Sequence, residues 1–204
     1  MQQIKNIIFD LGGIFLNIDF AKTEQSFVSL GITHFQTLYT QHHSSDLFEL
    51  LETGKLSPED FCEAFRKETN SNLTDEQIIT AWNALLLDFP LERIQWLESI
   101  SKKYNVYLFS NTNKIHYDAF MTNFPLHTGL PDFNKYFIKA YYSHEMGLRK
   151  PYVESFRYIL DEQNLIAAET LFIDDTYKNI EGAKQAGLHT VHLVSPKTVL
   201  DLEL

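Results

Sequence analysis

The sequence predicts an α/β fold, in which a Rossmann-like parallel sheet carries helices on both faces and an α-helical cap is inserted into it. In residues 1–16 and 90–204, short apolar, β-branched runs alternate with segments of helical periodicity. This alternation is typical of parallel strands joined by helices. Residues 17–89 show helical periodicity alone. We therefore assign residues 1–16 and 90–204 to the core and residues 17–89 to the cap.

The first predicted strand covers residues 4–9, ends at Asp10 and is followed by Gly12 and Gly13. A short apolar run before a glycine pair indicates a buried strand that enters a tight loop. Further strands are predicted at residues 105–109, 136–142, 170–173 and 189–193. Helices are predicted at residues 91–103, shortly after 111, at 152–163 and at 178–186, with a turn-rich patch at 125–131.

The predicted cap contains four or five helices and no strand. Its apolar residues recur at helical spacing, and Ser57-Pro58 and Thr74-Asp75 mark two helix starts. Serine and threonine suit the N-cap, while proline and aspartate suit the first turn that follows. The cap is therefore expected to fold as helices packed on one another.

Polar residues follow the predicted core strands at positions that should meet. In parallel α/β sheets, ligands bind beyond the carboxyl ends of the strands. That edge should gather Asp10, Ser110, Asn111, Asp174 and Asp175, with Lys150 from the loop after the third strand. Crowded carboxylates need a cation, and oxygen ligands favour Mg²⁺. Backbone N–H groups of a glycine loop can approach an anion closely. Together these features predict a magnesium-assisted site for a phosphoryl group.

Composition narrows the possible partners. The chain has 17 basic and 27 acidic residues, a formal net charge of -10, and no basic cluster. This argues against a nucleic-acid partner, which requires a basic surface. The single cysteine, Cys62, cannot form an internal disulfide and agrees with a reducing cytosol. No signal peptide and no apolar run of transmembrane length are visible, so we expect a cytoplasmic protein that does not bind membranes. The oligomeric state is not readable.

Four separated motifs carry a family resemblance. In chain order they read Asp10-Leu-Gly-Gly, Ser110-Asn-Thr-Asn, Gly147-Leu-Arg-Lys-Pro and Asp174-Asp-Thr-Tyr-Lys-Asn. With these motifs the chain resembles the haloacid dehalogenase superfamily of hydrolases with a helical cap. Within it, the motifs are similar to those of bacterial α-D-glucose-1-phosphate phosphatases. The resemblance implies a magnesium-dependent phosphatase acting on a small phosphomonoester, for example a sugar phosphate such as glucose 1-phosphate.

The resemblance also implies a role for each residue in the reaction. Asp10 would attack phosphorus and form an aspartyl-phosphate, and Lys150 would neutralise both this nucleophile and the transferred oxygens. Ser110 and Asn111 would bind the phosphate together with Lys150.

The remaining implied roles concern the metal. Asp10, the backbone carbonyl of Gly12 and Asp175 would ligate Mg²⁺. Asp174 would hold a metal-bound water, and Asn179 would brace the acidic loop.

Gly12 departs from the usual pattern of the family. Most phosphatases of the superfamily have a second aspartate at this position, as a general acid and base worth about 10²–10⁴-fold in rate. A sugar 1-phosphate would tolerate the loss, because its anomeric oxygen leaves readily. Alternatively, the protein is a catalytically weakened relative that only binds. A haloacid dehalogenase-type hydrolase is a further alternative, but it needs no metal and would leave the pair Asp174-Asp175 unexplained.

Other polar residues have simpler interpretations. Arg149 is predicted to make a surface or cap contact rather than to act in catalysis. The pair His42-His43 is predicted to lie at a solvated helix end rather than to line a substrate pocket, and without a third ligand nearby it is a poor zinc site. Substrate choice is expected to reside in the cap, where the turn at Thr53-Gly54-Lys55 is a candidate to approach the site.

Overall fold

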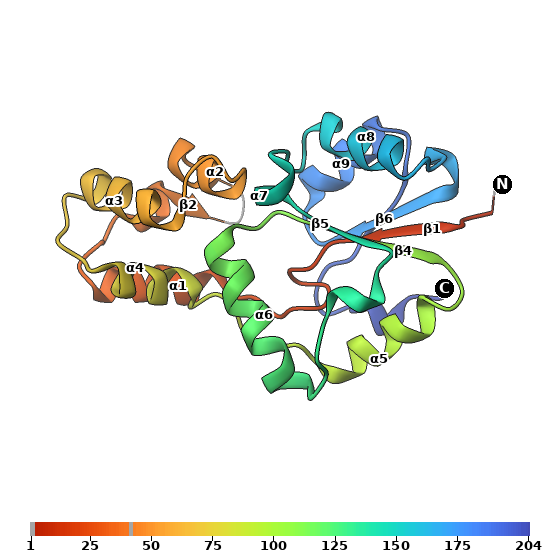
Figure 1. The fold of residues 1–204 in the computed structure, drawn as a ribbon, viewed down its shortest axis with the longest axis horizontal. Coiled ribbons are helices and arrows are strands. Elements are labelled where there is room, and N and C mark those ends of the chain that lie inside the picture. The colour runs from red at the N-terminus through yellow and green to blue at the C-terminus, as the bar shows by residue number, and fades with distance from the viewer. Residues whose placement is uncertain (1–2, 41–42) are drawn as a thin grey trace.

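The computed structural model describes residues 3–40 and 43–204. Five parallel strands form the central sheet in the order β5-β4-β1-β6-β7 (Figure 1). The strands are β1 (Asn6–Phe9), β4 (Asn105–Ser110), β5 (Lys139–Tyr142), β6 (Thr170–Asp174) and β7 (His189–His192). The predicted α/β class is confirmed. No helix in the described part of the chain is long and apolar enough to cross a membrane.

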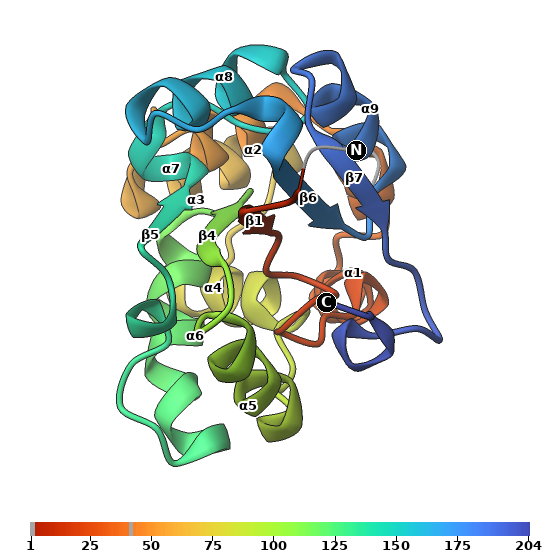
Figure 2. The ribbon, with the colours of Figure 1, turned by 90° about the vertical axis from the view of Figure 1, so that its right-hand side faces the viewer.

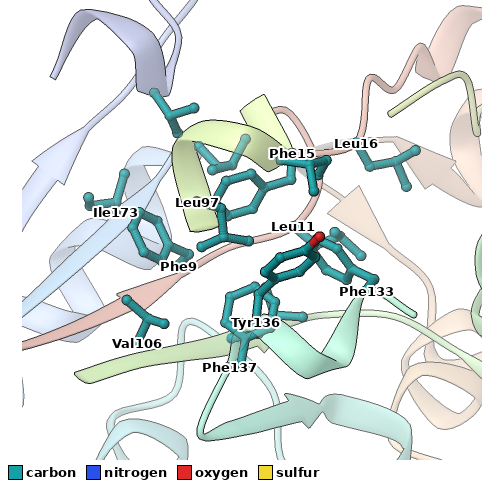
Figure 3. Packing of buried hydrophobic residues seen from close by; sticks show 14 of the residues in the cluster. Phe9, Leu11, Phe15, Leu16, Leu97, Val106, Phe133, Tyr136, Phe137 and Ile173 are labelled. Carbon is teal, nitrogen blue, oxygen red and sulfur yellow. The ribbon is translucent and has the colours of Figure 1, made fainter. Parts of the chain in front are cut away.

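Helices cover both faces of the sheet (Figure 2). One face packs on α8 (Val153–Glu162) and α9 (Tyr177–Gln185), and the other on α5 (Leu91–Ile100) and α6 (Lys114–Thr128). Side chains alternate between the faces, as the two-residue period of a strand requires. On β1, Ile8 belongs to the first core, on the side of α8 and α9. Ile7 and Phe9 belong to the second core, on the side of α5 and α6. Figure 3 shows part of this second core, with Phe9, Val106, Ile173 and Leu97 gathered together.

The inserted segment lies beside the core (Figure 1). Its buried side chains form a hydrophobic cluster of their own. Its helices are α1 (Phe20–Ser29), α2 (Asp46–Glu52), α3 (Pro58–Thr69) and α4 (Asp75–Asn83). Aromatic rings surround Trp82 in this cluster. Trp82 is fully buried and packs against Phe48 and Tyr39. The four helices agree with the sequence prediction. The boundaries of core and cap at residues 17 and 89 stay a prediction.

The two segments that link core and cap are paired with each other. The amide of Asn17 donates to the carbonyl of Asp88 at 2.9 Å, and the amide of Leu87 donates to the carbonyl of Asn17 at 3.0 Å. Two residues further on, the amide of Asp19 donates to the carbonyl of Leu85 at 2.9 Å. The chain thus enters and leaves the cap through one hydrogen-bonded ribbon.

The cap also touches the core away from the ribbon. The ring of His116 on α6 stacks on Trp82 of α4, with centroids 4.5 Å apart. After α2, Gly54 lies against α7 (Ser143–Met146), and a Cβ atom there would stand 2.0 Å from the carbonyl oxygen of His144. The turn after α2 therefore makes a backbone contact with the core, and its expected approach to the site stays a prediction.

The structure differs from the sequence expectations in the cap and around α6 and α7. The cap contains a short hairpin of β2 (Tyr39–Thr40) and β3 (His43–Ser44), whose two-residue strands are too short to show a period. Helix α6 runs through Pro125 to Thr128, where a turn-rich patch was expected, because Phe120 and Phe124 anchor it in the core. The short α7 was not predicted. The one-turn 3-10 helices of the described residues are η1 (Phe35–Thr37), η2 (Asn134–Tyr136), η3 (Ala167–Glu169) and η4 (Val199–Asp201). His42 lies outside the described residues, and His43, expected at a helix end, instead begins β3.

Candidate active site

Three carboxylates and one ammonium group meet at the carboxyl edge of the sheet. Asp10 follows β1, Asp174 ends β6 and Asp175 follows it, and one oxygen of each lies within 4.8 Å of the others. The Lys150 ammonium lies 2.7 Å from Asp10 Oδ1 and 2.7 Å from Asp174 Oδ2. The register of the sheet explains the meeting, because Phe9 pairs with Ile173 and thereby sets Asp10 beside Asp174.

Lys150 is almost completely buried between core strands. Its ammonium lies 5.4 Å from the centre of the Phe109 ring and 5.5 Å from that of Phe172. Burial lowers the pKa of Lys150, but the carboxylates of Asp10 and Asp174 more than offset this and hold it above its ordinary value. Lys150 therefore carries a fixed positive charge at neutral pH.

The carboxylates outnumber the single ammonium that faces them. Burial raises the pKa of Asp10; the Lys150 ammonium opposes the shift, and the charges of Asp174 and Asp175 add to it. Burial and the charge of Asp174 likewise raise the pKa of Asp175. Crowded anions of this kind are stabilised by a cation, and an all-oxygen donor set is the one that Mg²⁺ prefers. The residues present thus fit a divalent metal such as Mg²⁺.

Protein donors already occupy Asp174. The Asn179 amide donates to both of its oxygens at 3.1 Å, and the Thr176 backbone amide donates to Oδ1 at 2.7 Å. With the Lys150 contact, these bonds hold the carboxylate rigidly. Asn179 thus braces the acidic loop, and Asp10 and Asp175 keep more of their oxygen atoms open to a ligand.

The glycine loop after β1 lies directly against this cluster. Gly13 has φ +72, and a Cβ atom there would stand 2.6 Å from Asp175 Oδ2. Gly12 lines the cavity, and a Cβ atom there would stand 2.9 Å from Cδ1 of Ile18. The space in which a side chain at position 12 would start is therefore apolar.

Ser110 and Asn111 lie at the end of β4, as predicted, and both line the cavity. Ser110 is buried. The Asn111 side chain donates to the Lys150 carbonyl at 2.9 Å and accepts from the Lys150 amide at 2.9 Å. Both ends of the amide are thus engaged with the backbone of Lys150. The Asn111 side chain positions Lys150.

A cavity of about 390 Å³ opens above these residues, between the core and the cap. The core contributes all of the predicted site residues except Asp174 to its lining. The cap contributes Tyr39, Glu49 and Glu52, and the loop before Lys150 contributes Arg149. Arg149 contacts the cap, as predicted, through ion pairs with Glu49 and Glu52.

Sequence reasoning missed Glu52 and Tyr39 as cavity residues. A glutamate at the end of an amphipathic helix is expected in solvent, yet Glu52 is 4% exposed while Leu50 is 37% exposed. The available signal was weak. Glu49 and Glu52 lie three residues apart, so they share one face of α2.

Residues 7–193 match the family model of haloacid dehalogenase-like hydrolases. The chain belongs to the haloacid dehalogenase-like hydrolases. The match covers the core strands as well as the inserted cap, and it confirms the resemblance carried by the four motifs. The acidic site described above therefore belongs to a haloacid dehalogenase-like fold.

Three proteins similar to this hydrolase match over nearly their whole length. D-ribitol-5-phosphate phosphatase of Bacteroides thetaiotaomicron is 34% identical over 187 residues, covering 92% of this chain and 90% of that protein. A crystal structure of a haloacid dehalogenase family enzyme from the same organism, an aspartate-to-alanine mutant with magnesium and inorganic phosphate, has a TM-score of 0.89 at 31% identity, covering 95% and 96%. A predicted hydrolase of this family from Porphyromonas gingivalis has a TM-score of 0.84 at 29% identity, covering 93% and 91%.

Proposed function

We propose that this hydrolase is a magnesium-dependent phosphatase that releases phosphate from a small sugar or polyol phosphate. The observation that carries the proposal is the contact of Asp10 with Lys150 beside Asp175, at the floor of a cavity closed by the cap. The similarity to a polyol phosphate phosphatase, and to a structure that holds magnesium and phosphate, supports it.

Asp10 is the nucleophile in this proposal. Its carboxylate oxygen bonds to phosphorus as the ester P–O bond breaks, and the alkoxide released takes up a proton to leave as an alcohol. Water then attacks phosphorus, the bond to Asp10 breaks, and inorganic phosphate leaves. Dividing the reaction at an aspartyl-phosphate replaces one difficult step with two easier ones.

Lys150 and Ser110 hold the phosphoryl group during the transfer. The Lys150 ammonium already contacts Asp10 at 2.7 Å, so it faces both the nucleophile and the oxygens that approach it. The Ser110 hydroxyl donates to one of these oxygens, and Asn111 contributes by fixing the Lys150 backbone. In phosphoryl transfer, positioning and charge stabilisation of this kind supply most of the rate.

The metal site of the proposal consists of Asp10, Asp175 and the backbone carbonyl of Gly12. Bound Mg²⁺ supplies the positive charge that offsets the phosphate and the surplus carboxylates. Asp174, held in place by the bonds from Asn179, would orient a water next to the metal.

Two observations favour different leaving groups. Gly12 and the apolar Ile18 beside it offer no acid to protonate an alkoxide, which favours a sugar 1-phosphate such as glucose 1-phosphate, with its anomeric leaving oxygen. The similarity to a D-ribitol-5-phosphate phosphatase favours a phosphate on a primary alcohol. Both substrates are neutral apart from the phosphate and rich in hydroxyls, and both belong in the first assay.

The test is phosphate release with Mg²⁺ from glucose 1-phosphate, ribitol 5-phosphate and p-nitrophenyl phosphate. Wild-type protein should release phosphate, and Asp10→Asn should lose at least 1,000-fold in kcat/KM, because the amide keeps the shape but is no nucleophile. Asp161→Asn, an equivalent change on the exposed face of α8, should retain full activity.

Other outcomes of the same assay distinguish the alternatives. If the wild-type protein binds Mg²⁺ and inorganic phosphate but hydrolyses none of the three esters, the chain is a binding protein weakened by Gly12. Halide release from a haloacid in the presence of chelator would instead identify a dehalogenase. Undiminished phosphate release by Asp10→Asn would exclude the aspartyl-phosphate.

A further inference from the structure

Glu52 is a buried carboxylate that the proposed reaction does not use. It ends α2 in the cap and is 4% exposed, yet it lines the same cavity as Asp10. The Tyr39 hydroxyl donates to Glu52 Oε1 at 3.2 Å. The other oxygen, Oε2, is buried and makes no hydrogen bond within the described residues.

Arg149 meets this carboxylate from the core. Its Nη2 lies 3.0 Å from Glu52 Oε2, an ion-pair contact without hydrogen-bond alignment, and its Nη1 donates to Glu49 Oε2 at 3.3 Å. The Nε of Arg149 is also buried, and in residues 3–40 and 43–204 it has no hydrogen-bond partner. An acceptor from the cap and a donor from the core thus line one cavity with unused hydrogen-bonding capacity.

A hydroxyl group suits this pair chemically. Buried polar atoms are normally hydrogen-bonded, so an unused acceptor beside an unused donor indicates a ligand group that can serve both. A hydroxyl can donate its hydrogen to Glu52 Oε2 and accept from the Arg149 guanidinium. A second phosphate or a carboxylate on the substrate would meet the Glu49 and Glu52 carboxylates and be repelled.

We propose that Glu52, paired with Arg149, binds a hydroxyl of the leaving group and selects neutral polyhydroxylated phosphate esters over esters that carry a second anionic group. The proposal rests on the proposed phosphatase function and adds a specificity determinant to it. Because Arg149 precedes Lys150 in the chain, the hydroxyl contact is fixed relative to the phosphate contact. The cap therefore reads the part of the substrate that the core does not hold.

The experiment compares Glu52→Gln with the wild type on ribitol 5-phosphate and on n-propyl phosphate. Both are esters of primary alcohols, but only the first carries further hydroxyls. The variant should lose about tenfold in kcat/KM for ribitol 5-phosphate, mainly through KM, since a charge-assisted hydrogen bond is replaced by a neutral one. Its kcat/KM for n-propyl phosphate should stay within twofold. On 2-phosphoglycolate the variant should gain at least threefold, because a repelling carboxylate is gone.

Glu63→Gln on α3 is the matched control, because it removes a cap carboxylate that is 61% exposed. This variant should leave kcat/KM unchanged for both ribitol 5-phosphate and n-propyl phosphate. Equal losses of Glu52→Gln on ribitol 5-phosphate and n-propyl phosphate would overturn the proposal, because they would place Glu52 at the reacting phosphate or in the fold alone. No loss on ribitol 5-phosphate would overturn it as well. A wild-type protein inactive on every ester would contradict the proposed function itself, before any variant is compared.

Discussion

Among single residues, Lys150 contributes most to the order of the site. Its ammonium contacts the carboxylates of Asp10 and Asp174. Its backbone N–H and C=O groups both form hydrogen bonds with the Asn111 side chain. One buried cation thus positions residues from three separate segments of the chain. The cost of burying a charge is offset by its two partners, as buried charges require.

At the same scale, Gly13 controls the shape of the acidic cluster. Gly13→Ala should lower the affinity for Mg²⁺ at least tenfold, because the added methyl group would stand 2.6 Å from Asp175 Oδ2 and displace that carboxylate. Isothermal titration with Mg²⁺ measures the change.

Gly31→Ala in the cap is the matched control for this prediction. Gly31 also has positive φ, +93, but a Cβ atom there meets nothing within 4 Å. Both variants should lose about 1 kcal/mol of stability from backbone strain. Only Gly13→Ala should weaken Mg²⁺ binding, and equal affinities would mean that the loop does not shape the site.

The sequence was sufficient to predict the residues at strand ends but not those of the cap. Asp10 and Asp174 follow from strand length and the rule that parallel strands end at one edge, so their meeting was predictable. Glu52 and Arg149 meet across the interface of cap and core, and this contact depends on how two units pack. No periodicity within one segment contains that information.

At the scale of elements, the contact of α4 and α6 joins the cap to the core. The His116 side chain on α6 lies 3.1 Å from the carbonyl oxygen of Trp82, and its other ring nitrogen lies 3.2 Å from the Asn113 amide. Burial lowers the pKa of His116 to about 4. The neutral ring is therefore the form that the folded protein accommodates.

This pKa predicts a pH dependence of stability. In the unfolded chain His116 takes up a proton near pH 6.5, whereas in the folded protein it does so only near pH 4, so stability falls as the pH drops through this window. At pH 4.5 the loss from His116 should be about 2 kcal/mol relative to pH 7. Urea unfolding at the two pH values measures it.

His116→Gln should reduce this loss by about the same 2 kcal/mol, because glutamine does not titrate. His34→Gln, at an exposed position, should leave the difference between the two pH values as in the wild type. Burial also lowers the pKa of His144 to about 4, so part of the acid sensitivity should persist in His116→Gln. An unchanged pH difference in His116→Gln would show that this histidine does not limit stability.

The elements themselves were predictable where burial on both faces gave long apolar runs. Strand β6 was expected at residues 170–173 and covers Thr170–Asp174. Local signals failed where tertiary packing overruled them. Proline normally interrupts a helix, but Pro125 lies in the last turn of α6, which its buried phenylalanines hold in place and Gly129 ends.

For the whole molecule, Mg²⁺ binding and stability should be linked. A metal that binds only the folded state adds about 2.7 kcal/mol at 100 times its Kd. In a chain of this length that corresponds to a rise of about 5–10 °C in Tm. Differential scanning calorimetry with and without Mg²⁺ measures the shift, with NaCl at equal ionic strength as the control.

Asp175→Asn should remove most of the magnesium shift. Without metal this variant should melt no lower than the wild type, because it removes one of three crowded carboxylates. A full shift in Asp175→Asn would exclude this carboxylate as a ligand. Cytoplasmic location and the absence of a nucleic-acid partner stay predictions from the cysteine content and the acidic charge balance.

Because of the paired ribbon at Asn17 and Asp88, the cap is one contiguous segment attached to the core at a single place. The chain leaves the core and returns to it at two points that are held together by backbone hydrogen bonds. The spacing of the two core segments at this position is therefore set by the ribbon and not by the cap. Inserts of other lengths joined at these two points should leave β1, and Asp10 that follows it, in place. Chemistry and recognition are thereby separable in this architecture, and a new substrate can be acquired by exchanging one contiguous segment.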